Sequence, residues 1–180
     1  MPRSPHRMTS IIFQSERLLC RHWIAEDFEP LLSVYSDPEA MKWVGEGEPI
    51  NRSQCEEWFR VTEANYAKHG YGMFALAQRE SGCVVGFAGL VHPGGQVEPE
   101  IKYAFLRSHW GFGLASEVVP QLLDYGARVH ALRRIIATVA LENLASQRVL
   151  TKAGMVLAER RLNEDASTTL VYHWHTPSAA

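Results

Sequence analysis

The chain has 180 residues, a hydrophobic content of 46% and a formal net charge of -2 at pH 7, which predict one compact domain and argue against a broad basic surface for nucleic acid. Three widely spaced cysteines without a CxxC pair indicate reduced thiols in a cytoplasmic protein, with no disulfide framework. No apolar run approaches membrane-spanning length, so we expect no membrane partner.

The first half of the chain predicts a strand region, two helices and a hairpin. We expect a loose leader at residues 1–10, a folded domain at 11–176 and a short tail at 177–180. Residues 11–23 favour a strand, and a helix is expected from near Asp27 to just before Asp37-Pro38, followed by a short helical turn through Met41. Ser53 and Glu56 have capping-box spacing, which predicts a helix that ends at His69-Gly70. Residues 71–79 and 83–92 read as an antiparallel hairpin.

A strand, a glycine-containing loop and a helix occupy the centre of the chain. The apolar run that begins at Glu100 predicts the strand, and a helical period starts at Leu114. Gly111 and Gly113 lie between them, where the unpaired amides of the first helical turn face an anion and a missing Cβ permits close approach. We therefore expect a phosphate-bearing ligand here, although the dinucleotide fingerprint and the Walker lysine are both missing. Pro120 falls inside the predicted helix and favours a kink.

The last third of the chain alternates strands and a helix. Residues 134–139 predict a buried strand, residues 144–153 a short helix that stops at Gly154, and residues 156–162 and 168–175 two further strands. The order and lengths of all these elements predict an α/β protein with a mixed sheet and helices on both faces.

Four motifs in order resemble the GNAT superfamily of N-acetyltransferases, in the branch that includes the ribosomal-protein N-terminal acetyltransferases. They are SERLLCR from Ser15, EDFEPLLSVYSDPEAM from Glu26, the central strand with WGFGLA from Trp110, and ENLASQRVLTKAGM from Glu142. The likeness spans about residues 11 to 175. It implies a single-domain fold with a mostly antiparallel central sheet that splays after the central strand, and acetyl-CoA as co-substrate without a metal.

The same resemblance implies a set of site residues. Those expected to bind acetyl-CoA are Ala104, Phe105, Trp110, Gly111, Phe112, Gly113, Leu114, Ala115 and Asn143. Glu100 matches the acidic residue that could act as base, or it is a solvated charge at a strand end. Ser146 matches the serine that protonates the departing thiolate, or its hydroxyl caps a helix start. Asn143 could cap that helix as well.

Two positions depart from the branch. Phe112 stands where the branch usually has Arg or Lys, and Lys102 replaces a usual glycine beside Glu100. The first departure removes a positive charge near the CoA phosphates, and the second crowds or tunes the acceptor side. His173 and His175 share a strand face, but no third ligand has recognisable spacing, so we expect no metal.

The acceptor is expected to be a primary amine. Deprotonating a lysine at pH 7 costs roughly 4–5 kcal/mol and a peptide α-amine only about 1 kcal/mol, so weak base machinery suits an α-amine. A protein N-terminus, a polyamine or an aminoglycoside-like amine all remain open, as does a monomer or a homodimer. Glu46, Glu48, Glu98 and Glu100 are expected to form an acidic rim for a cationic amine. The alternatives from other classes are a non-catalytic acyl-CoA-binding module and a nucleotide-binding regulatory domain.

Overall fold

The computed structural model describes residues 10–45 and 47–177. The expected leader and tail therefore lie outside the described residues, apart from Ser10 and Pro177, and so does Glu46 of the expected acidic rim. Within the described ranges, no helix combines the length and apolarity needed to cross a bilayer.

Eight strands form one sheet in the order β1-β2-β3-β4-β5-β6-β8-β7. The strands are β1 (Ile11–Gln14), β2 (Leu18–Arg21), β3 (Met73–Gln78), β4 (Val84–Val91), β5 (Glu100–Phe105), β6 (Arg134–Ala140), β7 (Val156–Leu162) and β8 (Thr168–His175). Neighbours pair antiparallel throughout, except that β5 and β6 are parallel. The prediction of a mixed, mostly antiparallel sheet is confirmed.

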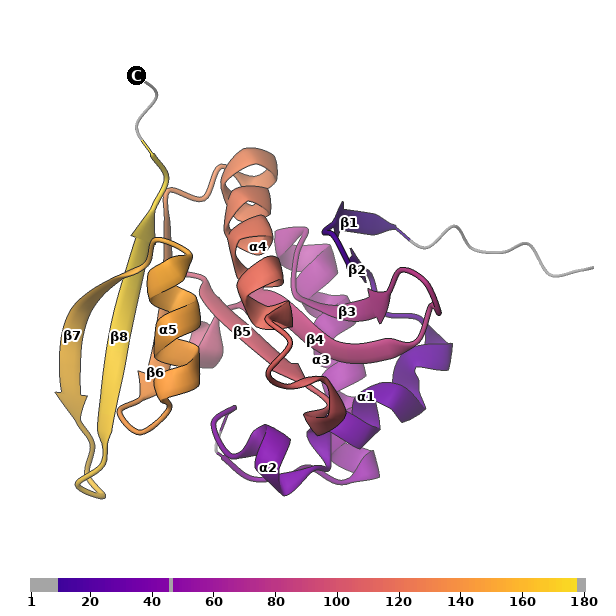
Figure 1. Ribbon diagram of the computed structural model, residues 1–180, viewed down its shortest axis with the longest axis horizontal. Coiled ribbons are helices and arrows are strands. Elements are labelled where there is room, and N and C mark those ends of the chain that lie inside the picture. The colour runs from indigo at the N-terminus through magenta and orange to yellow at the C-terminus, as the bar shows by residue number, and fades with distance from the viewer. Residues whose placement is uncertain (1–9, 46, 178–180) are drawn as a thin grey trace, which may run out of the picture.

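Helices cover both faces of the sheet (Figure 1). The helices are α1 (Phe28–Tyr35), α2 (Pro38–Met41), α3 (Arg52–His69), α4 (Leu114–His130) and α5 (Leu144–Lys152). Side chains of α4 and α5 join one apolar cluster, and side chains of α1, α2 and α3 join the other. β5 contributes to both clusters, because successive side chains on a strand point to opposite faces: Ile101 and Phe105 pack with α4, and Ala104 packs with α1. α4 runs unbroken past Pro120.

The parallel strands β5 and β6 are paired only at the start of β5 and then diverge. Glu100 and Ile136 are the one registered pair between these strands, and the Ile136 N–H donates to the Pro99 carbonyl at 2.9 Å. β4, by contrast, pairs with β5 along its length, from Glu100 to Phe105. The expected splay of the sheet after the start of the central strand is confirmed, and it leaves the far edge of β5 free of a neighbouring strand.

Two local predictions were wrong. Residues 11–23 form two strands, because the Ser15 N–H donates to the Leu18 carbonyl at 2.9 Å and turns the chain back on itself. The capping box of α3 lies two residues earlier than Ser53 and Glu56. There the Asn51 side chain accepts from the Gln54 N–H at 3.0 Å, and the Gln54 side chain accepts from the Asn51 N–H at 2.8 Å. Asn and Ser are equally good N-cap residues, so residue type alone did not decide whether α3 is capped by Asn51 or by Ser53.

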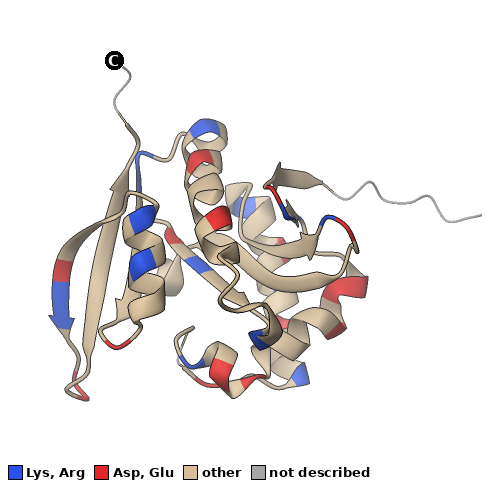
Figure 2. Ribbon diagram, in the orientation of Figure 1, with Lys and Arg blue, Asp and Glu red and all other residues tan. Residues whose placement is uncertain are grey.

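Charges of both signs are interspersed over the face drawn in Figure 2, on the helices and on the outer strand β7. This distribution agrees with the small net charge.

Candidate active site

A cavity of about 470 Å³ lies where β5 and β6 diverge. Its lining comes from α2 and the segment after it, from β5, from the loop between β5 and α4, from the start of α4, and from β6 and α5. The residues are Ala40, Trp43, Val44, Ile101, Lys102, Tyr103, Ala104, Phe105, His109, Trp110, Gly111, Gly113, Leu114, Ala115, Ser116, Thr138, Val139, Asn143, Ala145, Ser146, Arg148 and Val149.

One end of this cavity is built from backbone. Gly111 and Gly113 have φ angles of 80° and 78°, a conformation that side chains with a Cβ rarely adopt. Gly113 is the N-cap of α4 and offers no side-chain cap, so the first amides of the helix lack an intrahelical partner. A Cβ built on Gly111 would meet nothing within 4 Å, so the approach to the loop is open. This end fits the pyrophosphate of acetyl-CoA by its free amide donors and the positive end of the helix dipole.

The residues expected to bind acetyl-CoA line the cavity, with the exception of Phe112. Their role in binding stays a prediction. Trp110 also fixes the loop to the strand before it, because its indole Nε1 donates to the Phe105 carbonyl at 2.9 Å. Phe112 is 65% exposed and lines a second hollow together with Arg17 and Arg79.

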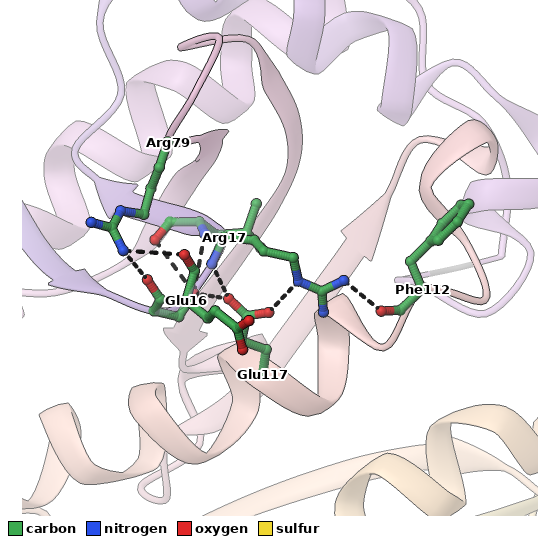
Figure 3. Close-up of polar contacts among 7 residues, drawn as sticks. Glu16, Arg17, Arg79, Phe112 and Glu117 are labelled. Carbon is green, nitrogen blue, oxygen red and sulfur yellow. Dashed lines mark hydrogen bonds and ion pairs between the residues drawn. The ribbon is translucent and has the colours of Figure 1, made fainter.

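Arg17, which the sequence did not single out, contacts the loop between β5 and α4 (Figure 3). Its Nη1 donates to the Phe112 carbonyl at 2.8 Å, and its Nε donates to Glu117 Oε2 on the first turn of α4 at 2.8 Å. Burial opposes ionisation of Glu117, but hydrogen bonds from Ser15 and Arg17 outweigh it and lower the pKa of this carboxyl. The carboxylate therefore stays charged at neutral pH and keeps Arg17 in place.

This contact orients one amide of the loop. In a trans peptide the C=O and the following N–H point in opposite directions. With the Phe112 carbonyl turned to Arg17, the Gly113 N–H points away from Arg17. Arg17 thus fixes the orientation of the peptide between Phe112 and Gly113.

Arg17→Met is expected to raise the Kd for CoA about fivefold, or roughly 1 kcal/mol, because the loop loses the donor that fixes its peptide. Arg79→Met is the matched control. Arg79 Nη1 donates to the carbonyls of Ser15 and Glu16 in the same turn and makes no contact with the loop among those drawn in Figure 3. Calorimetric titration with CoA measures both. Equal losses would show that the turn, and not the Arg17 contact with Phe112, matters.

A hydroxyl pair lies on the α5 side of the cavity. Ser146 Oγ and the Tyr103 hydroxyl are 2.6 Å apart. Burial raises the pKa of Tyr103 to about 12, although the hydrogen bond with Ser146 lowers it in part, so the phenol keeps its proton. The Asn143 side chain accepts from the Ser146 N–H at 3.1 Å, which is the cap expected for α5. The Ser146 hydroxyl is therefore bonded to a side chain and not to backbone.

Glu100 lies behind the cavity wall. Its side chain is 4% exposed and does not belong to the lining, whereas Lys102 and Thr138 do. The carboxylate accepts from the Thr138 hydroxyl and pairs with the Lys102 ammonium, and Gln96 Nε2 is 3.4 Å from its second oxygen. Thr138 was not predicted, although the two-residue period of its strand places it opposite the buried Ala137 and Val139.

The acidic rim is not found among the described residues. Glu48, Glu98 and Glu100 do not line the cavity, and Glu98 Oε1 accepts from Arg134 Nη1 at 3.2 Å. The local sequence did not show that Arg134, on β6, pairs with Glu98. Glu46 lies outside the described residues, so the rim as a whole stays a prediction. Of the histidines, His109 lines the cavity and His92 does not. Arg134 Nη2 lies 2.9 Å from a ring nitrogen of His173.

Comparisons with known proteins agree with this geometry. The family described as "Acetyltransferase (GNAT) domain" matches residues 17–156. The chain is 32% identical, over 76% of its length and 77% of the relative's, to the uncharacterized N-acetyltransferase p20 of Bacillus licheniformis. A GNAT-family acetyltransferase from Bacillus anthracis superposes with a TM-score of 0.77 at 26% identity, over 90% of this chain and 96% of that one. RimL, a ribosomal L7/L12 α-N-protein acetyltransferase solved with coenzyme A, shares the fold with a TM-score of 0.78 at 18% identity, over 92% of this chain and 98% of that one.

Proposed function

This chain belongs to the GNAT acetyltransferase family and is an acetyl-CoA-dependent N-acetyltransferase, and from that premise we propose that its acceptor is a free α-amine, at a peptide N-terminus or on a small molecule. Acetyl-CoA supplies an activated acetyl thioester. The transfer is proposed to be direct, within a ternary complex of both substrates.

The observation that carries this proposal is the division of the cavity by β5. Tyr103 points to α5, where it meets Ser146, and Lys102 points the other way, where it meets Thr138. The glycine loop lies at one end of the cavity and the apolar side chains of Trp43 and Val44 line it on the α2 side. The arrangement supports a donor bound along α4 and α5 and an acceptor that enters past α2.

The proton of the amine needs a path out of the cavity. We place the base role on Glu100 acting through Thr138, because the carboxylate does not line the cavity but accepts a hydrogen bond from the Thr138 hydroxyl, which does. As the C–N bond forms and the C–S bond breaks, the amine proton passes to Thr138 Oγ1 and the hydroxyl proton of Thr138 passes to Glu100. A relay of this kind is modest base machinery, and it suits an α-amine, which loses its proton at a cost of about 1 kcal/mol at pH 7.

Glu100→Gln and Thr138→Val are both expected to lower kcat/KM about tenfold near pH 6 and little near pH 9, since general-base help is needed most when the amine is protonated. Glu98→Gln is the control, because Glu98 is a nearby carboxylate outside the cavity lining. The pH profile of initial rates is the measurement. If kcat/KM falls by the same factor at every pH, Glu100 and Thr138 act only by positioning the Lys102 side chain.

Release of free thiol from acetyl-CoA, followed against a panel of peptides, amino acids and polyamines, tests the function itself. A transferase releases thiol with a free α-amine and gives intersecting double-reciprocal plots for the two substrates. A non-catalytic acyl-CoA-binding module would bind CoA in calorimetry and release no thiol with any amine. If polyamines are acetylated faster than α-amines, the proposed acceptor is wrong, but acetyl transfer from acetyl-CoA still stands.

A further inference from the structure

Positively charged side chains line the cavity, and no carboxylate of the described residues does. Among its described lining residues, Lys102 and Arg148 are the Lys and Arg side chains, and none is Asp or Glu. Arg148 lies on α5, the helix of Ser146, and so belongs to the donor side. Lys102 lies on the opposite side with Thr138, where the acceptor is proposed to bind.

Lys102 presents its charge to the cavity, and its counterion stays behind it. The Lys102 side chain is 24% exposed and the Glu100 side chain 4%. An ammonium has three N–H donors. One is used by Glu100 and a second by Thr138 Oγ1, 3.4 Å away, so one donor remains for a ligand.

We propose that the acceptor amine carries a carboxylate close to its amino group and that Lys102 binds this carboxylate. The inference rests on the proposed function and names its substrate class. A charge-assisted hydrogen bond between ammonium and carboxylate is roughly twice as strong as a neutral one, which makes the third donor of Lys102 a recognition element. A polyamine would instead bring positive charge against Lys102 in a partly buried site, where charges are screened less than in water.

The carboxylate has two sources with the same chemistry. It is the α-carboxylate of a free amino acid, or the side chain of an acidic first residue of a peptide. Both place the anion within a few bonds of the reacting nitrogen, and the apolar lining at Trp43, Val44 and Ala40 accepts the rest of either molecule.

Matched acceptors test the inference in wild-type protein. Thiol release is measured with Asp-Ala-Ala-amide against Asn-Ala-Ala-amide, and with alanine against alaninamide, each rate being expressed per unprotonated amine. At least one pair is expected to show a tenfold or greater preference in kcat/KM for the carboxylate member. A preference in the peptide pair alone identifies a peptide N-terminus, and a preference in the amino-acid pair alone identifies a free amino acid.

Variants at Lys102 connect the preference to this side chain. Lys102→Met is expected to abolish it, Lys102→Arg to keep most of it, and the exposed Lys152→Met to leave it unchanged. CoA affinity, measured beside these rates, is expected to stay at the wild-type value in all three.

Two outcomes separate the inference from the function. Thiol release with α-amines but without preference for the carboxylate member, or a preference that survives Lys102→Met, overturns the role of Lys102 and leaves the transferase assignment standing. Thiol release with no amine at all removes the proposed function as well.

Discussion

Ser146→Ala is expected to lower kcat about a hundredfold while the Kd for CoA stays within a factor of two, because a positioned proton donor contributes of the order of 10²-fold or more to a rate. Ser146 lines the cavity, and its hydroxyl is hydrogen-bonded to the Tyr103 hydroxyl. Burial raises the pKa of Tyr103, so the phenol stays protonated. When Tyr103 donates to Ser146, the hydrogen of Ser146 is free to go to the departing sulfur. The loss falls on kcat because the thiolate forms only as the C–S bond breaks.

Tyr103→Phe and Ser116→Ala show whether this interpretation is correct. Tyr103→Phe removes the partner but leaves the serine, so a smaller loss is expected. Ser116 is another serine of the cavity lining, on α4, and its replacement is expected to leave kcat near the wild-type value. Single-turnover and steady-state rates give the comparison. If Ser146→Ala keeps the wild-type kcat, then water or another group protonates the sulfur.

Gly113→Val is expected to weaken CoA binding at least tenfold, about 1.4 kcal/mol or more. The backbone of Gly113 has a φ of 78°, and a Cβ built there meets only Arg17 Nη2, at 3.8 Å. The substitution therefore strains the backbone and places a side chain next to Arg17, which donates to the Phe112 carbonyl, so the loop is expected to lose the geometry that binds CoA; it does not clash with the core.

Gly82→Val separates these two effects. Gly82 has a φ of 71°, a Cβ added to it would meet nothing within 4 Å, and it sits outside the cavity in the turn between β3 and β4. Both variants are expected to lose stability through the same strain, but only Gly113→Val should lose CoA affinity. In melting curves, CoA is expected to raise the Tm of the wild type and of Gly82→Val by mass action, and to fail with Gly113→Val at the same concentration. Normal CoA binding by Gly113→Val would place the phosphates elsewhere.

Features that depend on neighbouring residues in the sequence could be predicted, and features that depend on contacts between distant residues could not. The elements from β6 to β8 were predicted to within a residue or so, because hydrophobic period and flanking turn residues are local signals. The turn between β1 and β2 was missed because its residues carry no Gly or Pro, and its geometry depends on Ser15 and on Glu117, 102 positions away.

The site divides in the same way. The glycines, the cap Asn143 and Ser146 lie within recognisable motifs, and the structure brings them to one cavity. Arg17 contacts Phe112 across 95 positions, and Thr138 contacts Glu100 across 38. Pairings over such separations depend on strand order and register. A single sequence does not specify these, so it left open whether Glu100 is a base or a solvated charge at a strand end, and the structure shows the residue 3% exposed.

The alternation along β5 has a consequence for how such a catalyst diversifies. The donor is proposed to be held largely by main-chain amides and two glycines, which tolerate little change, whereas the opposite wall includes replaceable side chains such as Lys102, Trp43 and Val44. A single mutation at Lys102 therefore reaches the proposed acceptor side and leaves Tyr103, which contacts Ser146 of α5 from the opposite face of the strand, in place. Single substitutions during evolution can therefore change the acceptor while the reaction stays the same.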